Sequence, residues 1–230
     1  MLSTKILSLL IAICSYECAT YNIITIKPKT EPPKIDINPY KNLVSARNAP
    51  IDVVALIELA YRTPVQFECA LSITFGSLFQ LVKNNPLGPD GANVGIVTYN
   101  KFANVHLPLG SATAFSGVLV YPTPVFNGGS SKYLNVDTAL SLAYSMLNSS
   151  RPNAIKQIWV YISETSTGRP EITAKFMKSY GVKIDVFGLG PKVSSEQLNA
   201  IASSSMNVFT FPDYCSASNS LIDFVNKKFL

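Results

Sequence analysis

Charged residues are scarce in this sequence: they make up 14% of its 230 residues, against 47% hydrophobic ones. A disordered polyelectrolyte, a collagen-like repeat and a coiled coil each need a very different composition, so all three are excluded. The 19 basic residues outnumber the 14 acidic ones, yet they are scattered along the chain. Nucleic-acid-binding proteins usually gather such an excess in one stripe, and we therefore expect no nucleic-acid partner.

The motifs that carry common enzyme chemistry are also missing. Residues 58–64 follow the first predicted strand without a glycine, whereas a dinucleotide-binding turn needs glycines there so that backbone N–H groups can approach the pyrophosphate. The sequence has no G-x-S-x-G nucleophile elbow. Its one histidine, His106, lies in a predicted strand and is interpreted as an ordinary strand side chain. We predict that the protein is not an enzyme and uses no cofactor.

The first 19 residues have the layout of a secretory signal peptide. A short basic start ends at Lys5, an apolar run covers residues 6–13, and small residues such as Ala12 and Ala19 offer cleavage sites. The run is too short to span a bilayer, and no later stretch approaches the roughly 20 apolar residues of a membrane helix. A buried N-terminal helix is the alternative, although no polar helical face accompanies the run. We expect an exported, extracellular protein without a membrane span.

Of the four cysteines, Cys14 and Cys18 lie in or beside the predicted leader, which leaves Cys69 and Cys215. Their separation matches no zinc-site spacing, and thiols oxidise outside the cell. One long-range disulfide and two separate buried thiols both stay open, because sequence alone does not show proximity. Asn148 begins the one N-glycosylation sequon, Asn-Ser-Ser, which export would make usable.

The rest of the chain divides into a lead-in and one domain. Residues 20–50 are polar and punctuated by prolines, which predicts an extended lead-in without a core of its own. From residue 51 to residue 230, apolar runs of strand length alternate with helical periodicity, which predicts an α/β fold with a mostly parallel sheet between helices. Strands are predicted at residues 52–58, 94–99, 105–109, 155–163, 182–189 and 208–211, and helices at residues 64–82, 135–147, 170–180, 195–203 and 217–229.

The order of these segments resembles that of a von Willebrand factor type A domain. The resemblance covers residues 51–230 and implies a doubly wound sheet of five parallel strands and one short antiparallel edge strand, with helices on both faces. It also implies a binding role, commonly adhesion to matrix proteins or assembly of extracellular complexes. The matching segments are DVVALIE at residues 52–58, GIVTY at 95–99, DTAL at 137–140, GVKIDVFGLG at 181–190 and QLNAIA at 197–202.

Many members of that family bind ligands through a divalent cation held by an Asp-x-Ser-x-Ser loop, a threonine and a second aspartate. By resemblance, the five ligand positions are occupied here by Glu58, Ala60, Arg62, Leu134 and Glu164. The hydroxyl ligands are therefore gone, and each surviving carboxylate carries an extra methylene. Since Mg²⁺ demands near-octahedral oxygen ligands and a nearby arginine repels a cation, we predict a degenerate metal-ion-dependent adhesion site without a metal.

Arg62 has two interpretations at this stage. Its guanidinium group takes the cation's place between Glu58 and Glu164, or it points to water. The family frame also places Cys69 and Cys215 near the same edge of the sheet and so implies that they form a disulfide.

The predicted function is that of a secreted protein-binding or matrix-assembly module that acts without a bound metal. Its expected partners are extracellular matrix proteins or other secreted proteins, including further copies of itself. The alternative is a structural framework protein of a secreted fibrous or mineralised matrix, such as a shell or a byssus-like material. Candidate contact residues near the rim of the sheet are Tyr61, Arg62, Phe126, Tyr133 and Glu164.

Overall fold

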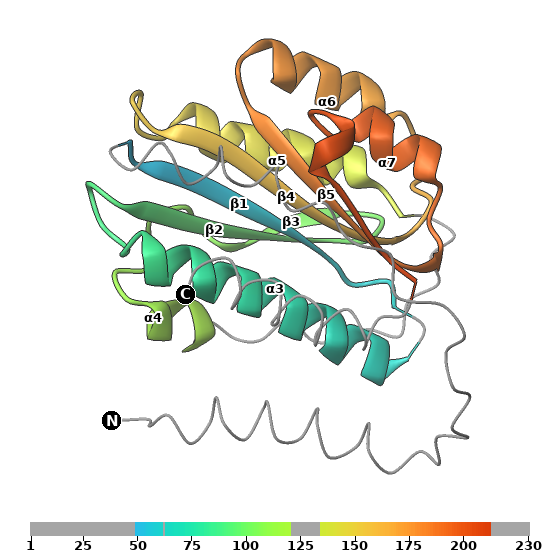
Figure 1. Ribbon diagram of the computed structural model, residues 1–230, viewed down its shortest axis with the longest axis horizontal. Coiled ribbons are helices and arrows are strands. Elements are labelled where there is room, and N and C mark those ends of the chain that lie inside the picture. Colours follow the sequence, from blue (N-terminus) through green and yellow to red (C-terminus); the bar gives the residue numbers. More distant parts are fainter. Residues whose placement is uncertain (1–48, 62, 121–133, 213–230) are drawn as a thin grey trace. The chain divides into compact units, whose positions relative to one another are not determined.

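The computed structural model describes residues 49–61, 63–120 and 134–212, which belong to the unit that begins at Ala49 (Figure 1). In the first half, strand β1 (Ile51–Glu58) is followed by helix α3 (Pro64–Asn84), strands β2 (Ala92–Tyr99) and β3 (Ala103–Leu107) and helix α4 (Phe115–Val120). The second half contains α5 (Val136–Asn148), β4 (Ile155–Glu164), α6 (Pro170–Ser179), β5 (Lys183–Lys192), α7 (Ser195–Ile201), the 3-10 helix η3 (Ser205–Asn207) and β6 (Val208–Phe211).

The six strands form one sheet in the order β3-β2-β1-β4-β5-β6. Strand β3 pairs antiparallel with β2, and every other neighbouring pair is parallel. The predicted fold, with one short antiparallel edge strand, is confirmed. Because the strand order runs outward from β1 in both directions, the topological switch point lies between β1 and β4. Open α/β sheets have their ligand crevice at such a point, beyond the carboxyl ends of the strands.

Strand β1 is buried along its whole length because helices cover both faces of the sheet. Val54 and Leu56 pack into a core shared with α5, α6 and α7, whereas Val53 and Ile57 pack into one shared with α3 and α4. Figure 1 shows these two sets of helices on opposite sides of the sheet. Because neither face of β1 meets water, its residues do not alternate between polar and apolar, and the strand therefore shows as a continuous apolar run in the sequence.

Side-chain oxygens cap the amino-terminal ends of the two longest described helices. The Thr63 hydroxyl accepts a hydrogen bond from the Gln66 N–H at the start of α3, and the Asn135 side-chain oxygen accepts one from the Thr138 N–H at the start of α5, each at 3.2 Å. Pro64 lies in the first turn of α3, as predicted, where its missing N–H has no helical partner to lose.

Some predicted boundaries differ from the observed ones. Strand β3 begins at Ala103, two residues earlier than predicted, and ends at Leu107 because Pro108 has no N–H to donate to the ladder. Helix α4 has only six residues, too few to show a helical period in the sequence, and was not predicted. The helix predicted at residues 217–229 lies outside the described residues.

Helix α3 qualifies as a membrane span by length and composition, with a mean hydropathy of 1.3 over its most apolar window. The sequence analysis expected no such stretch after the leader, so this expectation needs a correction. The apolar side chains of α3 have another use, since Ala70, Ile73 and Leu78 are buried in the core against the sheet. A core helix passes the same length and composition test.

Arg151, in the turn after α5, ties together the amino-terminal ends of the central strands. Its Nε–H donates to an oxygen of the fully buried Asp52 at 3.0 Å, and the two groups form an ion pair. A buried carboxylate is costly unless a counter-charge meets it, and here the guanidinium is that counter-charge. Its other N–H groups also donate to the backbone carbonyls of Ile51, Gly88, Pro89 and Gly91.

Candidate functional site

The candidate site lies at the carboxyl ends of β1 and β4, on either side of the switch point. Glu58 is the last residue of β1, and Glu164 is the last residue of β4. Ala60 follows β1 after one residue, and Leu134 directly precedes the Asn135 cap of α5. The fold therefore gathers four of the five predicted ligand positions around one edge of the sheet, while Arg62 lies outside the described residues.

Glu58 is fully buried and is held by one residue of the neighbouring strand, Ser163. The Ser163 N–H donates to one oxygen of the Glu58 carboxyl at 2.6 Å, and the Ser163 hydroxyl donates to the other oxygen, also at 2.6 Å. Both oxygens are thus engaged from the direction of β4. Ser163 was not among the predicted site residues, because its partner is distant in the sequence and only the parallel pairing of β1 with β4 brings the two together.

Burial raises the pKa of Glu58 from its ordinary value of 4.5 to about 7, because a charged carboxylate is poorly solvated in the core. The two hydrogen bonds from Ser163 act in the opposite direction, and the nearby charge of Glu164 raises the pKa further. Burial likewise raises the pKa of Tyr99, the β2 residue level with Glu58, and the Glu58 charge adds to that shift. Near neutral pH this carboxyl therefore carries its proton about half of the time.

Ala60 and Leu134 are buried and bring no side-chain oxygen to the site. Leu134 packs in the core shared with α5, α6 and α7. Its backbone carbonyl accepts hydrogen bonds from the Ser166 hydroxyl at 3.1 Å and from the Thr167 hydroxyl and N–H, both at 2.8 Å. The position of the family's ligand threonine therefore serves here to join the start of α5 to the loop after β4.

A second set of contacts fixes that loop from the other side. The Gln197 side chain, on α7, accepts a hydrogen bond from the Ser166 N–H at 2.7 Å and donates one to the Ser166 carbonyl at 3.1 Å. The Ser166 hydroxyl also accepts from the Val136 N–H at 3.0 Å. Sequence reasoning missed Ser166 and Gln197; the only available signal was their occurrence in loop and helix positions after predicted strands.

Glu164 is more accessible than Glu58, with 15% of its side chain exposed. The Lys192 ammonium group lies 3.9 Å from its carboxylate, and Lys192 belongs to the end of β5. The predicted bridge from Glu58 through Arg62 to Glu164 depends on a residue outside the described part of the chain and stays a prediction.

The rim candidates have different outcomes. Tyr61 is only 1% exposed and packs against Phe67 of α3, with ring centroids 5.8 Å apart, so its prediction as a surface contact is wrong. The ring is apolar enough to complete the core beneath α3, and the adjacent helix covers it. Arg62, Phe126 and Tyr133 lie outside the described residues.

The cysteine and sequon predictions are tested only in part. Cys69 is 4% exposed, on α3, and is disulfide-bonded. Cys215 lies outside the described residues, as do the other two cysteines, so the pairing of Cys69 stays a prediction. Asn148 is exposed and is the last residue of α5.

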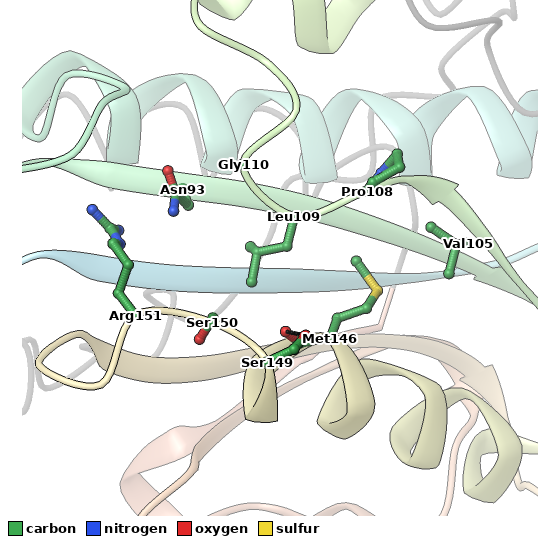
Figure 2. A pocket seen from close by; sticks show the side chains of 9 residues that line it. All are labelled: Asn93, Val105, Pro108, Leu109, Gly110, Met146, Ser149, Ser150 and Arg151. Carbon is green, nitrogen blue, oxygen red and sulfur yellow. Dashed lines mark hydrogen bonds between the residues drawn. The ribbon is translucent and has the colours of Figure 1, made fainter.

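An open hollow of about 700 Å³ lies at the opposite edge of the sheet, between the start of β2, the end of β3 and the end of α5 (Figure 2). Arg151 is its one charged lining residue, and the guanidinium N–H groups already donate to Asp52 and to backbone carbonyls. Leu109 and Met146 line the middle of the hollow. Without an available charged group, this hollow is a weaker candidate for specific recognition than the edge that carries Glu58 and Glu164.

Few side-chain oxygens face the switch point among the described residues. Glu58 is buried and engaged by Ser163, and Ala60 and Leu134 offer no side-chain oxygen. Within residues 49–61, 63–120 and 134–212, no three His, Cys, Asp or Glu side chains are grouped so that they could hold a metal ion. A hard cation such as Mg²⁺ needs several oxygen ligands in near-octahedral order, and among the described ligand positions only Glu58 and Glu164 bring a side-chain oxygen.

The sheet order and the two helical layers define a doubly wound α/β domain with one antiparallel edge strand. The chain belongs to the von Willebrand factor type A domain family, whose sequence profile matches residues 52–223. Among curated proteins, it is similar to the human collagen alpha-1(XXI) chain, with 26% identity over 179 residues. The match covers 76% of this chain but only 18% of the collagen chain.

Solved structures show the same fold. Proximal thread matrix protein 1 of the mussel byssus, in a structure with a zinc-occupied MIDAS motif, has a TM-score of 0.65 and 21% identity, over 79% of this chain and 46% of the other. The SpRpn10 VWA domain has a TM-score of 0.61 and 16% identity, over 76% of this chain and 95% of the other. Members of this family are usually non-catalytic binding modules.

The raised pKa of Glu58 predicts a specific dependence of stability on pH. Between pH 4.5 and 7, the unfolded chain loses its Glu58 proton while the folded chain keeps it. The contribution of Glu58 to the free energy of unfolding is therefore fully present below pH 4.5 and falls by about 3 kcal/mol as the pH rises to 7. Urea unfolding of the wild type and of Glu58→Gln from pH 4.5 to 8 isolates this contribution, since Gln cannot titrate.

We expect Glu58→Gln to be less dependent on pH than the wild type and more stable than it above pH 7. The exposed Glu196→Gln is the matched control and should leave the pH profile unchanged. Identical profiles for the wild type and Glu58→Gln would show that Glu58 titrates normally in the folded protein.

Proposed function

We propose that this protein is an exported protein-binding or matrix-assembly module that binds its partners without a bound metal. Three observations support the proposal: membership of the von Willebrand factor type A domain family, similarity to a collagen chain, and the leader-like residues 1–19. The chain spans less than a fifth of the collagen chain that it matches, so the partners of that collagen are not transferred here. Its expected partners are matrix or other secreted proteins.

The observation that carries the metal-free part of the proposal is the pairing of Glu58 with Ser163. Each Glu58 oxygen accepts a hydrogen bond from Ser163, so the carboxyl is oriented toward β4 and part of its acceptor capacity is already used. Protonation near neutral pH weakens any remaining attraction for a cation, because metal ions bind the deprotonated group. The Arg62 guanidinium remains our candidate for the space beside Glu164, where a fixed positive charge would oppose a metal ion.

Calorimetric titration of the purified chain with Mg²⁺, Mn²⁺, Ca²⁺ and Zn²⁺ tests the metal-free state. We expect only heats of dilution at pH 7, where a site with a full oxygen shell would give a saturable isotherm. The mussel byssus protein whose MIDAS motif is occupied by zinc is a suitable positive control. A micromolar isotherm that disappears in Glu58→Gln would contradict the proposal.

The second candidate function is a structural framework protein of a secreted fibrous or mineralised matrix. The fold match with a byssus matrix protein makes this alternative worth separating, although at 21% identity that match speaks for the fold alone. The two functions differ in how the protein is attached to the matrix. A binding module held by side-chain contacts can dissociate into solution, whereas a framework component stays in the matrix.

Sequential extraction of the native material distinguishes these attachments. We expect the protein to leave the matrix in high salt, because ionic and polar contacts at an exchangeable interface are screened. EDTA should release no more than buffer alone. Release by EDTA would contradict metal independence, and release only by denaturant or demineralisation would favour the framework function.

We also propose that Cys69 pairs with Cys215 and thereby pins α3 to the segment after β6. A bridge of this length removes much of the freedom of the unfolded chain, worth about 4–5 kcal/mol in the chain-entropy view. Peptide mapping without reduction should yield one linked pair of peptides that contain residues 69 and 215. A link from Cys69 to Cys14 or Cys18 would refute this pairing and would also show that the leader is retained.

A further inference from the structure

Three aromatic side chains form a cluster on the outer surface of α5 and α6. Tyr144 of α5 lies with its ring centroid 5.6 Å from that of Phe176 and 6.1 Å from that of Tyr180, and the last two are 4.8 Å apart. Phe176 is 50% exposed and Tyr180 is 64% exposed. We call Tyr144, Phe176 and Tyr180 the aromatic cluster. Rings that contact one another yet stay this open to water form a surface that another group can cover.

The aromatic cluster is bordered on α5 by uncharged, hydroxyl-bearing side chains. Ser141 and Ser145 are both exposed on this helix, and α5 has no basic residue in its last turn. On the α6 side, the exposed Lys175 lies next to Phe176 in the sequence. The α5 side of this surface offers a charged partner no counter-charge. It suits a neutral group that has both apolar faces and hydrogen-bonding hydroxyls, which is the chemistry of a sugar.

The only glycosylation sequon of the chain begins at Asn148, one helical turn after Tyr144. Side chains four residues apart on a helix are neighbours, with about 5–6 Å between their Cβ atoms. A helical side chain also leans toward the helix N-terminus. Helix geometry therefore places the exposed Asn148 next to Tyr144, on the side of α5 that carries the cluster.

We propose that Asn148 carries an N-linked glycan and that its first sugars pack on the aromatic cluster. The apolar face of a pyranose ring covers Tyr144 and Tyr180, while its hydroxyl and acetamido groups stay in contact with water. The covalent link keeps the sugar at a high local concentration next to the rings, so a weak contact is populated without a separate binding event. This inference rests on the export part of the proposed function, because such glycans are added only on the secretory route.

The glycan would also decide which surface is left for a protein partner. An exposed ring cluster on a secreted protein is otherwise a site of non-specific association, and a sugar that covers it directs partners elsewhere on the domain. Removal of the sugar would expose Phe176 and Tyr180 together with Ile172, which is 55% exposed and lies one turn before Phe176.

The test uses the full chain produced by cultured animal cells, once behind its own leader and once behind an unrelated secretory leader. Mass spectrometry of the peptide that contains Asn148 measures occupancy. The glycan is then trimmed enzymatically to its first N-acetylglucosamine, and the melting temperature is compared with that of Asn148→Gln. We expect the trimmed form to melt about 2–4 °C higher, the shift that one aromatic contact gives in a domain of this size.

The melting temperatures of the glycosylated and unglycosylated chains are also compared in the Tyr144→Ala and Tyr180→Ala variants. Because both chains of each pair carry the same tyrosine substitution, the direct effect of that substitution on stability cancels, and the sugar–ring contact is isolated. The difference between glycosylated and unglycosylated chains should shrink to less than half. Phe102→Ala is the matched control, since Phe102 is 66% exposed and lies at the turn between β2 and β3. In nuclear magnetic resonance spectra, the acetamido methyl signal should move upfield through the ring currents and return in Tyr180→Ala.

Each outcome decides a different point. Failure of secretion with the native leader alone would contradict export and leave the glycan contact to be judged from the second form. An unmodified Asn148 in that second form would overturn the proposed site. An occupied Asn148 whose methyl signal and melting difference do not change in the tyrosine variants would place the sugar in solvent and leave the aromatic cluster open to a protein partner.

Discussion

The buried carboxyl of Glu58 is the constraint on which the carboxyl edge of this sheet depends. A carboxylate at the end of the central strand cannot be left unpartnered in the core. Here Ser163 supplies two hydrogen bonds, and the protein interior supplies a raised pKa. The carboxyl of Glu58 thus finds its partners inside the protein, and the nearby Leu134 packs in the core and joins the start of α5 to the loop after β4 through its carbonyl.

Strand β1 carries a second fully buried carboxyl at its other end, and the comparison shows how different the two solutions are. Asp52 meets a guanidinium group that also binds carbonyls from the surrounding turns, so a charge pair fixes the amino edge. Glu58 meets a hydroxyl and an N–H, which a neutral carboxyl can also satisfy, because the hydroxyl of Ser163 can accept as well as donate. At the amino edge, the ion pair between Asp52 and Arg151 holds the strand ends together. At the carboxyl edge, the hydrogen bonds of Glu58 can persist when its carboxyl is protonated.

Much of the fold can be predicted from this sequence, because fully buried strands appear as continuous apolar runs and amphipathic helices show their period. Helix α4 was beyond such reasoning, since six residues span fewer than two turns. Tyr61 was misassigned as a surface residue because a tyrosine after a strand fits either environment, and its burial depends on where α3 places Phe67. Ser163 was missed for a similar reason: its role is set by a partner 105 residues away, through strand pairing rather than local sequence.

If the domain acts without a metal ion, as we propose, the kind of surface that can bind a partner also changes. A bound cation offers one strong, directional contact for a partner's carboxylate, so a small rim is sufficient. The inward-facing Glu58 carboxyl offers no such contact, and affinity then has to come from ordinary polar and apolar side-chain contacts spread over several residues. Among the exposed apolar side chains of the described residues, Ile172, Phe176 and Tyr180 lie along α6 and directly after it, whereas Val65 and Phe102 lie in the segments that follow β1 and β2 at the carboxyl edge. Under the metal-free proposal, recognition by this domain is therefore expected to use exposed side chains of α6 and of the segments at the carboxyl edge, together with whatever covers them.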